Sequence, residues 1–173
     1  MSHTITIRPA CPDDYDRVST LIARSYRALL ADAYTPSVLR DALPLITRAN
    51  PQLLRCGTYF LALDGANRPL AAGGWTDASP HGAPGRRGEG HVRHVATDPD
   101  IAMRGVGRRV MDHVLYSAAS AGITLLHCQS TLNARGFYAK FGFQSRGQID
   151  IRLTPGVLFP AVQMRRSAPA CPL

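Results

Sequence analysis

Cysteine, lysine and glutamate are all scarce in this 173-residue chain. Its four cysteines are Cys11, Cys56, Cys128 and Cys171. They form no C-x-x-C pair and no cysteine–histidine group with zinc-ligand spacing, so we expect reduced, structural thiols and no metal. Lys140 is the only lysine and Glu89 the only glutamate. The net charge of +8 therefore comes almost wholly from arginine, and a basic chain suits an anionic ligand.

Long apolar runs and blocks of like charge are also missing. No apolar run reaches the roughly 18 residues of a membrane span. Residues 1–8 also lack the basic segment followed by an apolar segment that is typical of an export signal. We therefore expect a cytoplasmic protein with no membrane partner. The arginines are spread along the chain without interleaved aromatic residues, which argues against a dedicated nucleic-acid-binding module.

Composition and periodicity predict one mixed α/β domain over residues 1–173, with a core at about 4–166 and a loose tail at 167–173. The expected order of elements is β-α-α-β-β-β-α-β-α-β-β. Strands are expected at residues 4–8, 58–63, 70–76, 91–97, 123–128, 143–153 and 157–164, the last with an edge or bulge at Pro160. Helices are expected at residues 12–30, 38–43 and 106–121 and from Asn133, and residues 77–90 predict a long surface loop.

A glycine turn opens the helix expected at residues 106–121. Gly105 and Gly107 let the backbone approach a bulky anion, and the first helical N–H groups lack partners. The helix dipole and the charges of Arg104, Arg108 and Arg109 add attraction. The turn could hold a pyrophosphate, or it could be a flexible helix start with a solvated basic face. It has neither the G-K-[ST] ending of a Walker loop nor the G-x-G-x-x-G of a Rossmann motif.

A second motif lies at residues 133–143. Ala134, Phe137 and Phe141 recur three and four residues apart, which predicts a helical stripe facing the core. Tyr138 lies about 100° from Phe137 around such a helix, at the edge of the stripe. Its phenol could donate a proton in a cleft, or it could pack on the sheet. Gly142 suits the end of this helix.

Found in this order, residues 97–108 and 132–143 resemble the two cofactor motifs of the GNAT N-acetyltransferases. The resemblance is specific over residues 90–147 and rests on element order over the first 76. It implies a GNAT-like mixed sheet in which two parallel strands, here 91–97 and 123–128, splay apart around acetyl-CoA. One departure is Ala102, which stands where the family has Gln or Arg. A side-chain donor to the pyrophosphate is therefore missing, and Arg104 or Arg108 would have to compensate.

The resemblance also implies roles for single residues. Backbone groups of the first splayed strand would pair with the pantetheine arm, and those of the glycine turn would hold the pyrophosphate. Tyr138 would stand near the sulfur as the general acid. The implied cofactor-binding residues are Val95, Ala96, Thr97, Met103, Arg104, Gly105, Val106, Gly107, Arg108 and Asn133.

Two residues, His91 and Glu89, are candidates for the general base. Many family members place a carboxylate early in this strand, where His91 falls here, and Glu89 shares its strand parity. An unperturbed imidazole, with a pKa of about 6.5, suits the role. His94 has the opposite parity and is expected to pack, and His127 is expected to be a satisfied core histidine. Candidate parts of an acceptor site are Tyr26, Tyr34, Trp75 and residues 77–90.

We therefore expect an N-acetyltransferase that moves an acetyl group from acetyl-CoA to a primary amine by direct attack in a ternary complex. The amine is a small molecule or a peptide, and a homodimer through the last strands fits the family. Two alternatives stay open. One is a non-catalytic acyl-CoA-binding or regulatory module of the same fold, and the other is a basic nucleic-acid-binding protein.

Overall fold

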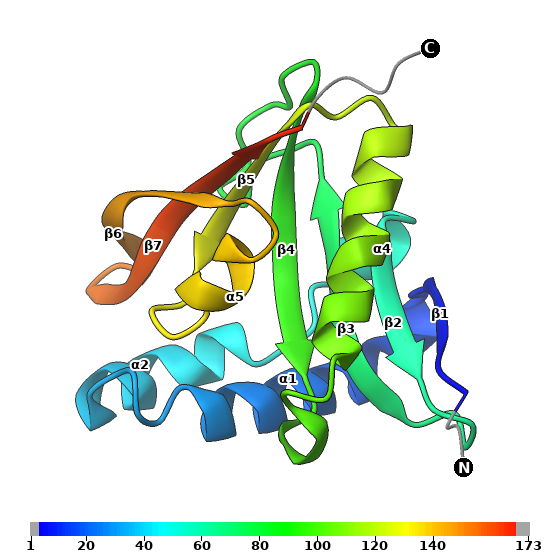
Figure 1. The fold of residues 1–173 in the computed structure, drawn as a ribbon. Helices are drawn as coiled ribbons and strands as arrows, with labels where there is room; N and C mark the ends of the chain where they lie inside the picture. The colour runs from blue at the N-terminus through cyan, green and yellow to red at the C-terminus, as the bar shows by residue number, and fades with distance from the viewer. Residues whose placement is uncertain (1–3, 169–173) are drawn as a thin grey trace.

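One sheet of seven strands organises the molecule, in the order β1-β2-β3-β4-β5-β7-β6 (Figure 1). The computed structural model describes residues 4–168. The strands are β1 (Thr6–Pro9), β2 (Tyr59–Leu63), β3 (Pro69–Thr76), β4 (Glu89–Thr97), β5 (Leu125–Ser130), β6 (Gln144–Thr154) and β7 (Val157–Ser167). Within residues 4–168, β4 and β5 are the only neighbours that run parallel.

Helices cover both faces of this sheet. α1 (Tyr15–Leu29) and α3 (Pro51–Arg55) pack on one face, and α4 (Val106–Ser120) packs on the other. β2 is buried along its whole length because alternate side chains face the two helical layers: Tyr59 and Leu61 face α1, whereas Phe60 and Ala62 face α4. α2 (Pro36–Ile46) packs with the end of α1 against Phe159 of β7.

β4 and β5 separate after a short parallel contact. Their register covers three pairs, the last of which is His91 with His127. Beyond that pair β5 continues along β7, and Figure 1 shows β4 and β5 fanning apart toward α1 and α2. The far half of β4 also carries a bulge, where its pairing with β3 shifts and His94 has a φ of 48°. The short helix α5 (Arg135–Ala139) follows β5 beside this opening.

The predicted order of elements and the mixed sheet with its splayed parallel pair are confirmed. α3 was not among the predicted helices, although Asn50 and Pro51 are a helix-start signal. The Asn50 side chain accepts from the Gln52 N–H at 2.9 Å, and Pro51 is the first helical residue. The strand predicted at 123–128 begins at Leu125 and runs to Ser130.

The predictions for the last strand need correction. β7 lies between β5 and β6 in the sheet, so the predicted edge is limited to the part of the strand around Pro160. Pro160 fits there because the ladder with β5 ends at Val162, so the proline has a strand partner on the β6 side alone. β7 also continues to Ser167, and the Ala168 N–H donates to Thr124 O at 2.8 Å. The predicted loose tail is therefore wrong at residues 167–168, while residues 169–173, with Cys171, lie outside the described part.

The three described cysteines are free thiols, of which Cys11 and Cys56 are exposed and Cys128 is buried. Between residues 4 and 168 there is no helix with the length and apolar character needed to cross a membrane.

Candidate active site

The glycine turn brings the start of α4 close to the end of β4. Gly105 is the N-cap of α4 and has a φ of 83°, in the left-handed region that favours glycine. Gly107 is buried, and a Cβ on it would lie 2.9 Å from Thr97 Oγ1 and 3.8 Å from the Phe137 ring. The absence of a side chain at Gly107 therefore lets α4 approach both β4 and α5.

Unpartnered backbone donors lie at this helix start. In the described chain, the N–H groups of residues 105–108 make no hydrogen bond, and the first α4 bond runs from Arg109 N to Gly105 O at 3.1 Å. Arg104 differs from the expectation because its N–H donates to Ile101 O at 3.2 Å. Met103 has a φ of 70° and a side chain that is 96% exposed. The Met103 N–H also has no hydrogen bond in the described chain, so the donor set for an anion is Met103 with residues 105–108, and the exposed Arg108 lies beside it.

An ion-pair clamp holds the loop that leads into this turn. Asp98 is 2% exposed, and its carboxylate accepts from the Asp100 N–H at 2.9 Å. Arg24 of α1 reaches over with one nitrogen 3.1 Å from Asp98 Oδ2 and another 2.9 Å from Asp100 Oδ2. A buried carboxylate needs such a partner, so Arg24 fixes the loop against α1.

Alternate backbone groups at the end of β4 face the opening. The Asp98 N–H donates to Leu70 O at 2.8 Å, toward β3. Because strand backbone groups alternate in direction, those of Thr97 and Val95 point away from β3, and those of Ala96 point toward it. Ala96 is therefore not placed as the family resemblance implies. The two groups that face the opening have only long contacts to α1, from the Thr97 N–H to Ser25 Oγ (3.3 Å) and from the Tyr26 hydroxyl to Val95 O (3.5 Å).

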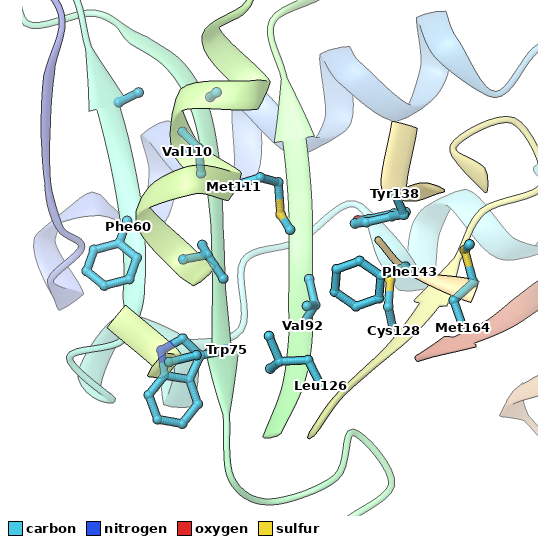
Figure 2. Packing of buried hydrophobic residues seen from close by; sticks show 14 of the residues in the cluster. Phe60, Trp75, Val92, Val110, Met111, Leu126, Cys128, Tyr138, Phe143 and Met164 are labelled. Atoms are coloured by element: carbon cyan, nitrogen blue, oxygen red, sulfur yellow. The ribbon is translucent and has the colours of Figure 1, made fainter. Parts of the chain in front are cut away.

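α5 points Tyr138 into the space where β4 and β5 diverge. Tyr138 is only 7% exposed, and its ring packs edge-on against Phe137. It also packs edge-on against Phe143 (Figure 2). Phe137 and Phe141, the expected core stripe, are only partly buried. The prediction of an edge position for Tyr138 is therefore wrong. Burial is the main cause that raises the pKa of the Tyr138 hydroxyl well above its ordinary value, followed by the nearby Cys128 thiol.

Asn133, just before α5, is engaged within the fold. Its Nδ2 donates to Leu29 O at the end of α1, over 2.8 Å. The side chain thus ties the loop after β5 to α1, and its hydrogen bond to the cofactor stays a prediction.

A small cleft opens on the sheet face opposite α4, at the last paired residues of β4 and β5. It has a volume of about 90 Å³, and its lining includes His81, His91, His127, Gln129 and Gln163. Gln129 Nε2 donates to His81 Nε2 at 2.9 Å, which joins the loop of residues 77–88 to β5. Imidazoles thus come from three separate segments to one concave site.

His91 and His127 stack in this cleft, with ring centroids 5.0 Å apart and planes at 22°. Glu89 Oε2 lies 3.0 Å from His127 Nε2. Burial, then the neighbouring His127 and Arg93, lowers the pKa of His91 from its ordinary value. The prediction that His127 is a satisfied core histidine is wrong, because its side chain is 26% exposed and its partner is a carboxylate in the cleft.

The other expected acceptor residues have mostly structural contacts. Trp75 is buried under α4 and donates from Nε1 to Ser117 Oγ at 3.0 Å. Tyr34 stacks on Phe159, accepts from the Leu132 N–H and donates to Pro160 O. Tyr26 alone of these three side chains reaches the opening beside β4.

His94 packs as predicted. Its Nε2 lies 3.1 Å from Ile46 O, and its ring meets Tyr26 edge-on. Burial lowers its pKa. Across residues 4–168, no three His, Cys, Asp or Glu side chains are grouped so that they could hold a metal ion.

Comparison with solved structures identifies the fold. A GCN5-related N-acetyltransferase from Rhodopseudomonas palustris matches with a TM-score of 0.73 and 19% identity, over 96% of this chain and 98% of that one. The PaiA N-acetyltransferase from Thermoplasma acidophilum, solved with coenzyme A, gives 0.66 and 12% identity over 95% and 99%. A GNAT family acetyltransferase from Brucella melitensis, solved with acetyl-CoA, gives 0.59 and 17% identity over 98% and 92%.

Sequence comparison gives the family itself. No curated protein matches the chain significantly. The family model for an acetyltransferase (GNAT) domain matches residues 55–145, more than half of the chain and the segment that holds the glycine turn, the diverging strands and Tyr138. This protein therefore belongs to the GNAT acetyltransferase family.

Proposed function

We propose that this protein transfers the acetyl group of acetyl-CoA to a primary amine, by direct attack within a ternary complex. The observation that carries the proposal is the divergence of β4 and β5 directly after the His91–His127 pair. The strands separate between the α4 start, with its unpartnered N–H groups, and the cleft that His91 and His127 line. We therefore expect the thioester to lie between the separated strands and the amine to enter the cleft.

The residues present fit acetyl-CoA, which would supply the activated thioester. The free N–H groups of residues 105–108, the α4 dipole and Arg108 suit a pyrophosphate. The backbone groups of Val95 and Thr97 suit the amide groups of a pantetheine arm, because the arm can pair along the free side of β4 as a strand would. Two solved GNAT structures that resemble this chain contain coenzyme A or acetyl-CoA, which supports the same assignment.

The protein must supply a proton acceptor for the amine and a proton donor for the leaving thiolate. An alkyl amine with a pKa near 10 is almost wholly protonated at neutral pH, so it must first lose a proton. Glu89 or His91 would accept that proton in the cleft. Tyr138 would donate to the sulfur from the other face of the sheet.

The proposal is tested with a panel of amines, assayed with acetyl-CoA by release of free thiol, while acetyl-CoA binding is measured separately by calorimetry. Amine-dependent thiol release is the expected result. Binding of acetyl-CoA without turnover on any amine would instead support a regulatory module. Salt-sensitive DNA binding that coenzyme A does not displace would support a nucleic-acid-binding protein.

The Arg24 clamp leads to a prediction about cosubstrate affinity. Arg24→Ala leaves the buried Asp98 carboxylate without its ion-pair partner and loosens the loop before the glycine turn. We expect the KM for acetyl-CoA to rise several-fold with kcat little changed, measured by initial rates at saturating amine. Arg27→Ala, an exposed arginine of the same helix, is the matched control. Equal KM values in the two variants would contradict the clamp.

A further inference from the structure

The imidazole cleft contains a histidine that is better equipped than His91 to accept a proton. His127 lies opposite His91 in the parallel register of β4 and β5, so both side chains project to the same sheet face. Both line the cleft, and their rings stack at 5.0 Å. An amine that enters this cleft therefore meets both imidazoles at once.

Glu89 determines which nitrogen of His127 carries the proton. Its Oε2 lies 3.0 Å from His127 Nε2, and an ionised carboxylate can only accept a hydrogen bond. Nε2 of the neutral ring must then be protonated, which leaves the lone pair on Nδ1. Within residues 4–168, Nδ1 has no hydrogen-bond partner. His127 thus has one nitrogen anchored on a carboxylate and the other free to accept a proton.

His91 has a different environment. It makes no hydrogen bond to any described side chain or backbone group and has no carboxylate in contact. Burial, then His127 and Arg93, lower the pKa of His91, and His81 adds to this; the Glu89 carboxylate acts in the opposite direction without offsetting them. When one of two stacked imidazoles takes up a proton, the charge disfavours protonation of the other. The carboxylate that can stabilise an imidazolium therefore contacts His127 and not His91.

The remaining charges around the pair do not reverse this preference. Arg165 of β7 is directly opposite His127 in the ladder and disfavours a positive ring. Arg93 of β4 also lies on the His91 side, where it donates to Thr76 Oγ1 at 3.0 Å. His81 of the loop lines the far wall of the cleft. Glu89 is the one carboxylate in direct contact with either stacked ring in the described chain, and it contacts His127.

We propose, on the basis of the acetyl transfer proposed above, that His127 is the catalytic base and Glu89 its positioning residue, with His91 remaining neutral beside them. His127 Nδ1 takes a proton from the amine as the amine nitrogen forms its bond to the acetyl carbon. The carbon–sulfur bond then breaks with its electron pair on sulfur, which gains a proton from Tyr138. The His127 proton then leaves to solvent through the open cleft, and the Tyr138 phenolate regains a proton from solvent once coenzyme A has left. Glu89 stabilises the imidazolium while it exists, as the carboxylate of a catalytic triad does.

A purely structural role is the alternative, since the Glu89–His127 pair also joins β4 to β5. Glutamine variants separate the two roles. His127→Gln keeps an N–H donor for Glu89 but has no group that can take a proton. Glu89→Gln keeps a hydrogen-bonding oxygen but loses the negative charge. Both variants keep a hydrogen bond between the two strands. His127→Gln removes the proton-accepting group, and Glu89→Gln removes the negative charge.

The test measures kcat/KM for the amine against pH, at saturating acetyl-CoA, together with the melting temperature. We expect His127→Gln to lose about 100-fold or more and Glu89→Gln to lose about tenfold with an altered acidic limb of the pH profile. Glu89→Asp should recover part of that loss. His91→Gln should lose less than His127→Gln. The matched control is His113→Gln on α4, whose ring packs on Phe60 away from the cleft.

Two results would overturn the proposal. One is a His127→Gln variant as active as the control, and the other is a His91→Gln variant that loses more activity than His127→Gln. If the wild-type protein acetylates no amine, the proposed function fails first. Nitrogen-15 NMR of the histidine rings then still tests the pair, because a neutral His127 protonated on Nδ1 contradicts the arrangement with Glu89.

Discussion

Tyr138→Phe should lower kcat by about tenfold or more and leave acetyl-CoA binding nearly unchanged. The substitution removes one hydroxyl and keeps the ring that packs against Phe137 and Phe143. Desolvation raises the pKa of this hydroxyl well above its ordinary value, so it is protonated at neutral pH. A thiol has a pKa near 8.5, and its thiolate would otherwise leave into a largely dry space without a donor. Loss of the hydroxyl therefore affects the departure of the sulfur.

Single-turnover kinetics with a good amine, combined with calorimetric titration of acetyl-CoA, checks this expectation. Tyr116→Phe is the control, because Tyr116 is 73% exposed on α4. The melting temperature of both variants shows whether the fold is kept. A Tyr138→Phe protein that turns over as fast as Tyr116→Phe would remove Tyr138 from the acid role.

Gly74→Ala should produce the largest loss of stability from one added methyl group. Gly74 lies in β3, opposite Tyr59 of β2, where the two backbones come unusually close. A Cβ at this position would overlap Thr58 O and lie 2.5 Å from Tyr59 Cα. Both are backbone atoms, at the residue before β2 and at its first residue, so neither can move aside cheaply. Overpacking of this kind costs about 3 kcal/mol, or about 10 °C in Tm for a chain of this size.

Thermal unfolding followed by circular dichroism measures the effect. Gly65→Ala in the turn after β2 is the matched control, because no atom lies within 4 Å of the Cβ it would carry. That variant should stay within about 0.5 kcal/mol of the parent protein. Equal melting temperatures for the two alanine variants would show that β2 and β3 can separate at this point without cost.

Local patterns were sufficient to predict the donor half of the site. The periodicity of α4, the glycines at its start and the order of strands and helices are all properties of consecutive residues. Each could be inferred because the physical cause, a helix stripe or a left-handed φ, acts within a few positions. The placement of α4 against the end of β4 then follows from Gly107, which has no side chain to keep them apart.

The base could not be predicted in the same way. Glu89 and His127 are 38 positions apart and meet only because β4 and β5 pair in parallel with one particular register. On its own short apolar strand, His127 has the pattern of a core residue. Tyr138 was misplaced for a related reason. Tyr138 is buried because its side chain lies between β4 and β5 where they separate. Helical periodicity carries no information about the separation of two strands, so it predicted only an edge position.

The interior position of β7 has a consequence for the order of events during synthesis. β7 is the last strand of the chain, yet it separates β5 from β6 in the sheet. Until residues 157–167 have left the ribosome, the outer edge of β5 has no partner, and β6 has no strand to pair with. A chain truncated before Val157 would carry the complete glycine turn and Tyr138 on an open edge that invites pairing with other chains. Full-length synthesis therefore decides when this half of the molecule can fold without aggregating.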